Sequence, residues 1–176
     1  SIPVNFVTDL QPVAGLPELR DLDVRFNEGL SDLSVVATLP LLGSLIAGLF
    51  GRIIGHRASE LVTTGMLFAS AALSVVTFGQ VAMGGGETQI IPILSWIQSG
   101  SFVADWTIRV DTMTAVMLVV VTGVSSLVHL YSIGYMHEDP GYQRFFSYIS
   151  LFTFAMLMLV MSNNFLQLFF GWEGVG

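Results

Sequence analysis

Four stretches of this chain contain no charged residue and are long and apolar enough to cross a lipid bilayer. They cover residues 33–51, 61–83, 112–131 and 145–161. A spanning helix needs about 20 predominantly apolar residues to cross about 30 Å of hydrocarbon. A further apolar run, residues 165–176, rises only about 18 Å as a helix. We therefore expect four complete transmembrane helices and the start of a fifth, in a chain that is a fragment.

Composition excludes several classes of function. Hydrophobic residues make up 53% of the chain, charged residues 11%, and the mean hydropathy of +0.74 lies outside the range of soluble domains. The net charge of -7 and the absence of lysine leave no basic patch for nucleic acid. No cysteine is present, and the three histidines, His56, His129 and His137, lack metal-ligand spacing. We predict no metal site and no bound cofactor in this chain.

The segment between the second and third apolar runs has a different period. Residues 84–86 are glycines that end a helix, and residues 102–110 alternate apolar and polar side chains. Such alternation is typical of a strand with one buried face. With residues 90–97 as its partner and 98–101 as the turn, it predicts a β-hairpin on the membrane surface. The fold class is thus an all-α membrane protein with a β-hairpin between helices two and three.

The pattern divides the chain into five parts. We expect residues 1–32 to be an extramembrane acidic segment of unknown role, either helical near 17–30 or disordered. Residues 33–83 hold helices one and two, 84–110 the hairpin loop, 111–163 helices three and four, and 164–176 the truncated fifth helix. Arginines are retained on the cytoplasmic or matrix side. Arg52, Arg57 and Arg144 therefore place the two short loops on that side and the hairpin opposite.

Glu173 is the main candidate for chemistry. It follows a long uncharged run, and an ionisable group inside a span costs several kcal/mol unless it is paired or hydrated. A carboxyl group in a low-dielectric interior holds its proton, and a nearby cation favours release. Moving that cation would load and unload a proton. The alternative is that the chain turns here and Glu173 lies at a watery interface.

His129 is a weaker candidate for proton transfer. It stands at the end of a polar stripe of Thr122, Ser125 and Ser126, spaced to share one helix face. Imidazole can take up a proton near neutral pH. A histidine among hydroxyls is, however, more often a satisfied packing residue than a proton relay.

Three stretches carry a resemblance to a known family. Residues 117–136, 152–160 and 164–176, the last reading Asn-Phe-Leu-Gln-Leu-Phe-Phe-Gly-Trp-Glu-Gly-Val-Gly, closely resemble subunit 5 (chain L) of NADH-quinone oxidoreductase, respiratory complex I. Residues 40–48 are similar to that family's first span. The resemblance covers about residues 33–176 and leaves 1–32 unaccounted for.

The resemblance implies proton translocation driven by quinone reduction elsewhere in the complex. It implies Glu173 as an intramembrane glutamate that pairs with a lysine on a later helix, and this chain has no lysine. The fragment alone should not be active. NADH, FMN, iron-sulfur clusters and quinone are expected in partner subunits, and the partners are other membrane subunits of complex I and the lipid bilayer. The location is an inner membrane, bacterial or mitochondrial, with several crossings.

Two other functions remain open from the residues. A cation/proton antiporter subunit of related fold would carry an equivalent glutamate, although the match over residues 117–136 favours complex I. A non-catalytic membrane scaffold would use its small-residue stripes only for assembly. An intramembrane position of Glu173 argues against a scaffold.

Overall fold

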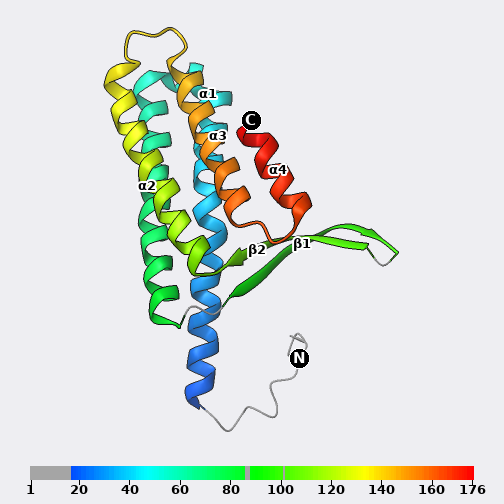
Figure 1. The fold of residues 1–176 in the computed structure, drawn as a ribbon. Helices are drawn as coiled ribbons and strands as arrows, with labels where there is room; N and C mark the ends of the chain where they lie inside the picture. The colour runs from blue at the N-terminus through cyan, green and yellow to red at the C-terminus, as the bar shows by residue number, and fades with distance from the viewer. Residues whose placement is uncertain (1–16, 86–87, 101) are drawn as a thin grey trace.

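The structure, a computed structural model, describes residues 17–85, 88–100 and 102–176. Its elements are α1 (Pro17–Met83), β1 (Gln89–Ser99), β2 (Phe102–Val110), α2 (Thr112–Tyr135), α3 (Tyr142–Val160) and α4 (Phe165–Val175) (Figure 1). Three helices in the described part are long and apolar enough to cross a membrane: α1 over Ser34–Met83, α2 and α3. The chain is therefore mostly helical, with one two-stranded antiparallel sheet.

The α1 element folds back on itself at Gly55. Gly55 has φ 83° and ψ 174°, a conformation that is essentially restricted to glycine. Figure 1 shows the two arms of α1 running side by side in opposite directions. A Cβ atom on Gly43 would lie 3.4 Å from Thr63 Cα, so the arms are in close contact. The expected count of four complete helices differs from the three spans found, because helices one and two form this single bent element.

The N-terminal part of α1 lies within the segment 1–32, which the sequence left either helical near 17–30 or disordered. The helix starts at Pro17 and continues into the first span without a break. The backbone of residues 17–30 is therefore helical, as one of the two alternatives predicted. It extends the first span and does not form a separate helix. Residues 1–16 lie outside the described part of the chain.

A proline inside the first arm explains one contact between the arms. Pro40 has no N–H, so it cannot bond the carbonyl of Val36 four residues earlier. The Ser70 hydroxyl of the second arm donates to that Val36 carbonyl at 2.6 Å. Both Val36 and Ser70 are fully buried. The carbonyl left free by proline is thus satisfied from the neighbouring arm.

The bundle has small polar side chains inside and large apolar ones outside. Thr63, Ser70, Ser74 and Thr77 of the second arm are buried. Leu49 and Ile53 of the first arm are exposed by 71% and 81%. This distribution is the reverse of a soluble protein's and suits a bundle surrounded by lipid.

The predicted hairpin is confirmed. β1 and β2 pair antiparallel, with register irregularities at Pro92/Leu94 and Ser95/Ile97. Ala104, Ile108 and Val110 of β2 are buried as the alternation predicted, whereas Phe102 near the turn is exposed. The base of β2 joins a core with side chains from α1, α2, α3 and the residue that follows α3, namely Val36, Ala37, Leu118, Leu157, Met158 and Met161. The hairpin is thereby fixed to one end of the bundle.

We predict that Ser70→Ala destabilises the subunit by about 1–3 kcal/mol, because the buried Val36 carbonyl loses its donor. Unfolding of the full-length subunit in detergent measures this cost. Ser74→Ala is the control. Its hydroxyl donates to Ser70 O within its own helix, so we expect a smaller loss.

Pro40→Ala provides the second half of the test. Alanine restores an N–H that can bond Val36 O, so Ser70→Ala should cost less in this background than in the wild type. Equal costs in both backgrounds would show that the proline does not create the need for Ser70.

Candidate functional site

The glutamate predicted to carry chemistry lies near the end of α4. Asn164 caps this helix, because its Oδ1 accepts a hydrogen bond from Gln167 N at 2.9 Å. Glu173 is exposed, and none of the described side chains forms a hydrogen bond or ion pair with it. Glu173 and His129 are not in contact in the structure. Its predicted place inside a membrane stays a prediction.

Two glycines hold α4 against α3. A Cβ atom on Gly171 would lie 2.6 Å from Leu159 N and 2.7 Å from Leu159 Cα. A Cβ atom on Gly174 would lie 2.8 Å from the Ala155 Cβ. Only glycine allows this approach of the two helices, because a Cβ atom on Gly171 would clash with the backbone of Leu159, which cannot rotate away. The glycines turn toward α3, and Glu173 lies on the exposed side of α4.

The start of α4 is bonded to the edge of β2. Gln167 is fully buried; its Oε1 accepts from Thr107 N at 3.2 Å, and its Nε2 donates to Thr107 O at 2.8 Å. Asn164 Nδ2 donates to Asp105 O at 2.8 Å. Sequence reasoning missed both amides. The available signal was a lone glutamine in an apolar run.

His129 is buried between α2 and α3. Its Nδ1 lies 2.9 Å from Ser125 O, and because a carbonyl can only accept, Nδ1 carries the hydrogen. In the neutral ring Nε2 then accepts from the Ser150 hydroxyl at 3.0 Å. Phe146 packs against the ring in an edge-to-face arrangement, at 5.8 Å between centroids. Both ring nitrogens have hydrogen-bond partners, as a satisfied packing residue requires.

Further hydroxyl side chains of α3 make polar contacts with the neighbouring helices. Thr153 Oγ1 bonds Ser125 Oγ on α2. Toward the other end, Ser147 donates to Ser44 O on α1 at 2.9 Å. All three helices therefore meet along buried hydroxyls and one imidazole.

A second polar contact, which the sequence did not reveal, closes the end of the bundle beside Gly55. The Tyr142 hydroxyl donates to Glu60 Oε2, and the His56 ring stacks on Tyr142 with 5.2 Å between centroids. Tyr142 is 1% exposed. The contact joins α1 to α3 at the end that carries Arg52, Arg57 and Arg144.

Comparisons with known proteins find relatives of this chain. The family model described as "NADH-Ubiquinone oxidoreductase (complex I), chain 5 N-terminus" matches residues 96–146. NADH-ubiquinone oxidoreductase chain 5 of Arabidopsis thaliana is 53% identical over 142 residues, covering 81% of this chain and 21% of the relative. NADH-quinone oxidoreductase subunit L of Neisseria meningitidis serogroup A is 54% identical over 143 residues, with the same coverage. That of Rickettsia conorii is 50% identical over 142 residues, covering 81% and 22%.

The chain belongs to the complex I chain 5 family. It spans about a fifth of the length of the curated relatives it matches, and corresponds to the N-terminal part. The residues matched by the chain 5 model include β2, α2 and the first residues of α3. They contain His129 and Tyr142, whereas Glu173 lies beyond them.

No group of three or more histidine, cysteine, aspartate or glutamate side chains among the described residues could hold a metal ion. The chain 5 relatives are named as subunits of an oxidoreductase.

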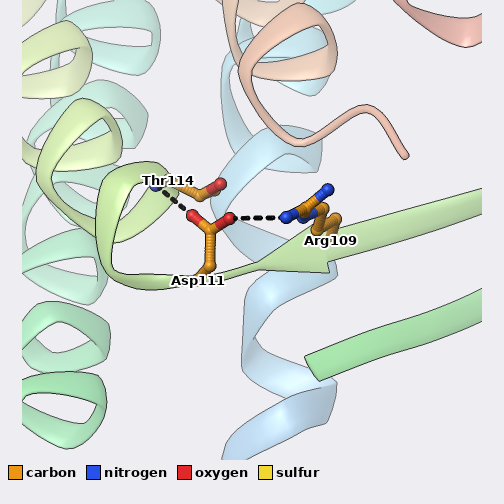
Figure 2. A network of polar contacts seen from close by, with 3 residues as sticks. All are labelled: Arg109, Asp111 and Thr114. Atoms are coloured by element: carbon orange, nitrogen blue, oxygen red, sulfur yellow. Dashed lines mark hydrogen bonds and ion pairs between the residues drawn. The ribbon is translucent and has the colours of Figure 1, made fainter. Parts of the chain in front are cut away.

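The matched region also contains a charged junction between the hairpin and α2. Figure 2 shows Asp111 between Arg109 and Thr114. Asp111 caps α2, accepting from Thr114 N at 2.8 Å, and Arg109 Nη2 lies 3.1 Å from Asp111 Oδ2. The hydrogen bond from the Thr114 backbone lowers the pKa of Asp111 below its usual range, and Arg109 adds to this effect.

This junction gives a pH-dependent prediction. The folded-state pKa of Asp111 is depressed, so its charge stabilises the fold above the unfolded pKa of about 3.9. That contribution is lost as pH falls through the folded pKa. Asp111→Asn retains a capping oxygen but not the charge, so its stability deficit against wild type should vanish at low pH. Unfolding of the subunit in detergent at several pH values measures it.

Asp111→Ala separates the cap from the charge. It removes the acceptor for Thr114 N as well as the charge, so it should cost about 1 kcal/mol more than Asp111→Asn at every pH. An Asn variant as unstable at low pH as the Ala variant would contradict this division.

Proposed function

We propose that this chain is the N-terminal part of a proton-translocating membrane subunit of NADH-quinone oxidoreductase, in which Glu173 takes up and releases a proton. One observation carries the proposal: a single carboxyl group stands on α4, an otherwise uncharged helix held against the membrane-length helix α3. The relatives' names supply the reaction class.

The proposed topology has four complete crossings and the start of a fifth. The two arms of α1 make the first two, α2 and α3 the next two, and α4 begins the fifth. The short loops at Gly55 and at residues 136–141 lie at one end of the bundle, joined by the Tyr142–Glu60 contact. The arginines of that end face the cytoplasm or matrix. The subunit is a multi-pass protein of the inner membrane.

The proposed partners follow from the same assignment. Other membrane subunits of the complex cover faces of the bundle, and lipid contacts the exposed apolar side chains. NADH, FMN, iron-sulfur clusters and quinone are bound by partner subunits. The free energy of quinone reduction reaches Glu173 through changes in the charges around it, because an approaching cation favours the ionised carboxylate and a departing one favours the acid.

We predict that Glu173→Gln in the full-length subunit lowers the number of protons pumped per electron while the complex still assembles. The amide has the shape of the acid but cannot titrate. Proton uptake and NADH oxidation are measured together in membrane vesicles, and complex abundance is measured separately. Glu138→Gln makes the same change in the exposed loop after α2 and should pump normally. A wild-type ratio in Glu173→Gln would favour the scaffold function.

We also propose a proton-transfer role for His129. Its support is the hydrogen-bonded arrangement at both ring nitrogens, with Ser125 O fixing the tautomer and Ser150 positioned either to donate to Nε2 or to accept from it. A proton arriving at Nε2 needs only a rotation of the Ser150 hydroxyl.

We predict that His129→Gln shifts the pH dependence of pumping while leaving assembly intact, because an amide replaces the hydrogen bonds without titrating. His129→Leu removes the hydrogen bonds as well, and should lower the amount of assembled complex. If His129→Gln pumps with an unchanged pH profile, His129 is a packing residue.

A further inference from the structure

Gln167 is the only fully buried polar side chain of α4, and it faces another element. Both polar atoms of its amide are used: Oε1 accepts from Thr107 N and Nε2 donates to Thr107 O. Thr107 stands opposite Pro92 at a position of the two-stranded sheet where the backbone N–H and C=O of Thr107 point away from β1. Gln167 therefore occupies the free side of β2 as a neighbouring strand would.

Two further bonds extend this attachment along the same edge. Asn164 Nδ2 donates to Asp105 O at 2.8 Å, and Arg109 N donates to Met161 O at 2.9 Å. The three contacts use residues 105, 107 and 109, whose backbone groups point to one side of a strand. The end of α3 and the start of α4 are thus fixed to three alternate positions along the outer edge of β2. The edge-to-face contact of Trp106 with Phe170, at 4.9 Å between centroids, adds to it.

The contact of α4 with α3 is different in kind. Gly171 and Gly174 allow the backbones to approach, but they have no side chains to interlock with Leu159 and Ala155. These glycines set the separation of the two helices, because a Cβ atom at either position would clash with α3. Hydrogen bonds of 2.8–3.2 Å at Gln167 tolerate little displacement. Gln167 is therefore the α4 side chain whose hydrogen bonds tie the height of the helix to β2.

We propose that Gln167 is a positioning residue that sets the height and rotation of the Glu173 carboxyl group through its bridge to β2. This rests on the proposed function of Glu173. Six residues separate the two side chains, a rise of about 9 Å and a rotation of about 240° along the helix. A shift of α4 by one residue would turn Glu173 by about 100°. The position of the proton-carrying group is then fixed relative to the hairpin.

The test uses Gln167→Met in the full-length subunit within the assembled complex. Methionine has a similar length and removes both hydrogen bonds. We expect normal complex abundance and quinone reduction, a displaced α4 by cryo-electron microscopy, and a ratio of protons to electrons that falls toward that of Glu173→Gln. The pH at which pumping is half-maximal should shift as well, which a purely structural role would not cause.

Leu166→Met is the matched control, because Leu166 is a neighbouring α4 residue that is 37% exposed. It should behave as wild type. If Gln167→Met fails to assemble, Asn164→Asp decides by the same measurements. Aspartate keeps the capping oxygen for Gln167 N and loses the donor to Asp105 O.

The outcomes separate this proposal from the one it rests on. A wild-type ratio in Glu173→Gln overturns the proton-carrying role of Glu173. A wild-type ratio and pH profile in Gln167→Met, alongside impaired Glu173→Gln, overturn the positioning role alone. An α4 that stays in place in Gln167→Met also overturns it.

Discussion

A backbone surrounded by hydrocarbon must satisfy its N–H and C=O groups from within the protein, and each irregular point of this bundle shows how that is done. At Pro40 the helix loses one hydrogen bond, and Ser70 of the neighbouring arm supplies it to Val36 O. At the end of α3, Met161 O accepts from Arg109 N of β2. These two hydrogen bonds join the arms of α1 to each other and the end of α3 to the hairpin.

The same constraint explains the distribution of polarity. Small hydroxyl side chains turn inward, where Ser74 and Thr77 donate to carbonyls of their own helix, while leucine and isoleucine face outward. Hydrophobic burial cannot hold helices together in lipid, so close approach and hydrogen bonds take its place. This leaves a hydroxyl-lined interior around His129. Such an interior binds the bundle together and also offers groups that exchange protons.

The α4 helix combines these features with the proposed chemistry. Its glycines approach α3, its amides bond to the hairpin, and its carboxyl group points to the exposed side. An element placed by hydrogen bonds at one end and by close backbone contact along one face can present a titratable group at a defined position. The hairpin thereby gains a part in the proposed mechanism, since its outer edge carries the attachment.

Much of this could be read from the residues. Uncharged runs predicted the membrane helices, alternation over residues 102–110 predicted β2, and the isolated Glu173 stood out because an ionisable group in an apolar helix is costly. These are local properties, set by composition and by the 3.6- and 2-residue periods. The fold-back at Gly55 as one bent element, the Ser70 donor for Val36, the Tyr142–Glu60 contact and the Gln167 bridge were not readable. Each joins residues far apart in sequence, and a hydrogen bond depends on positions within a few tenths of an ångström, which only the packed helices and hairpin provide.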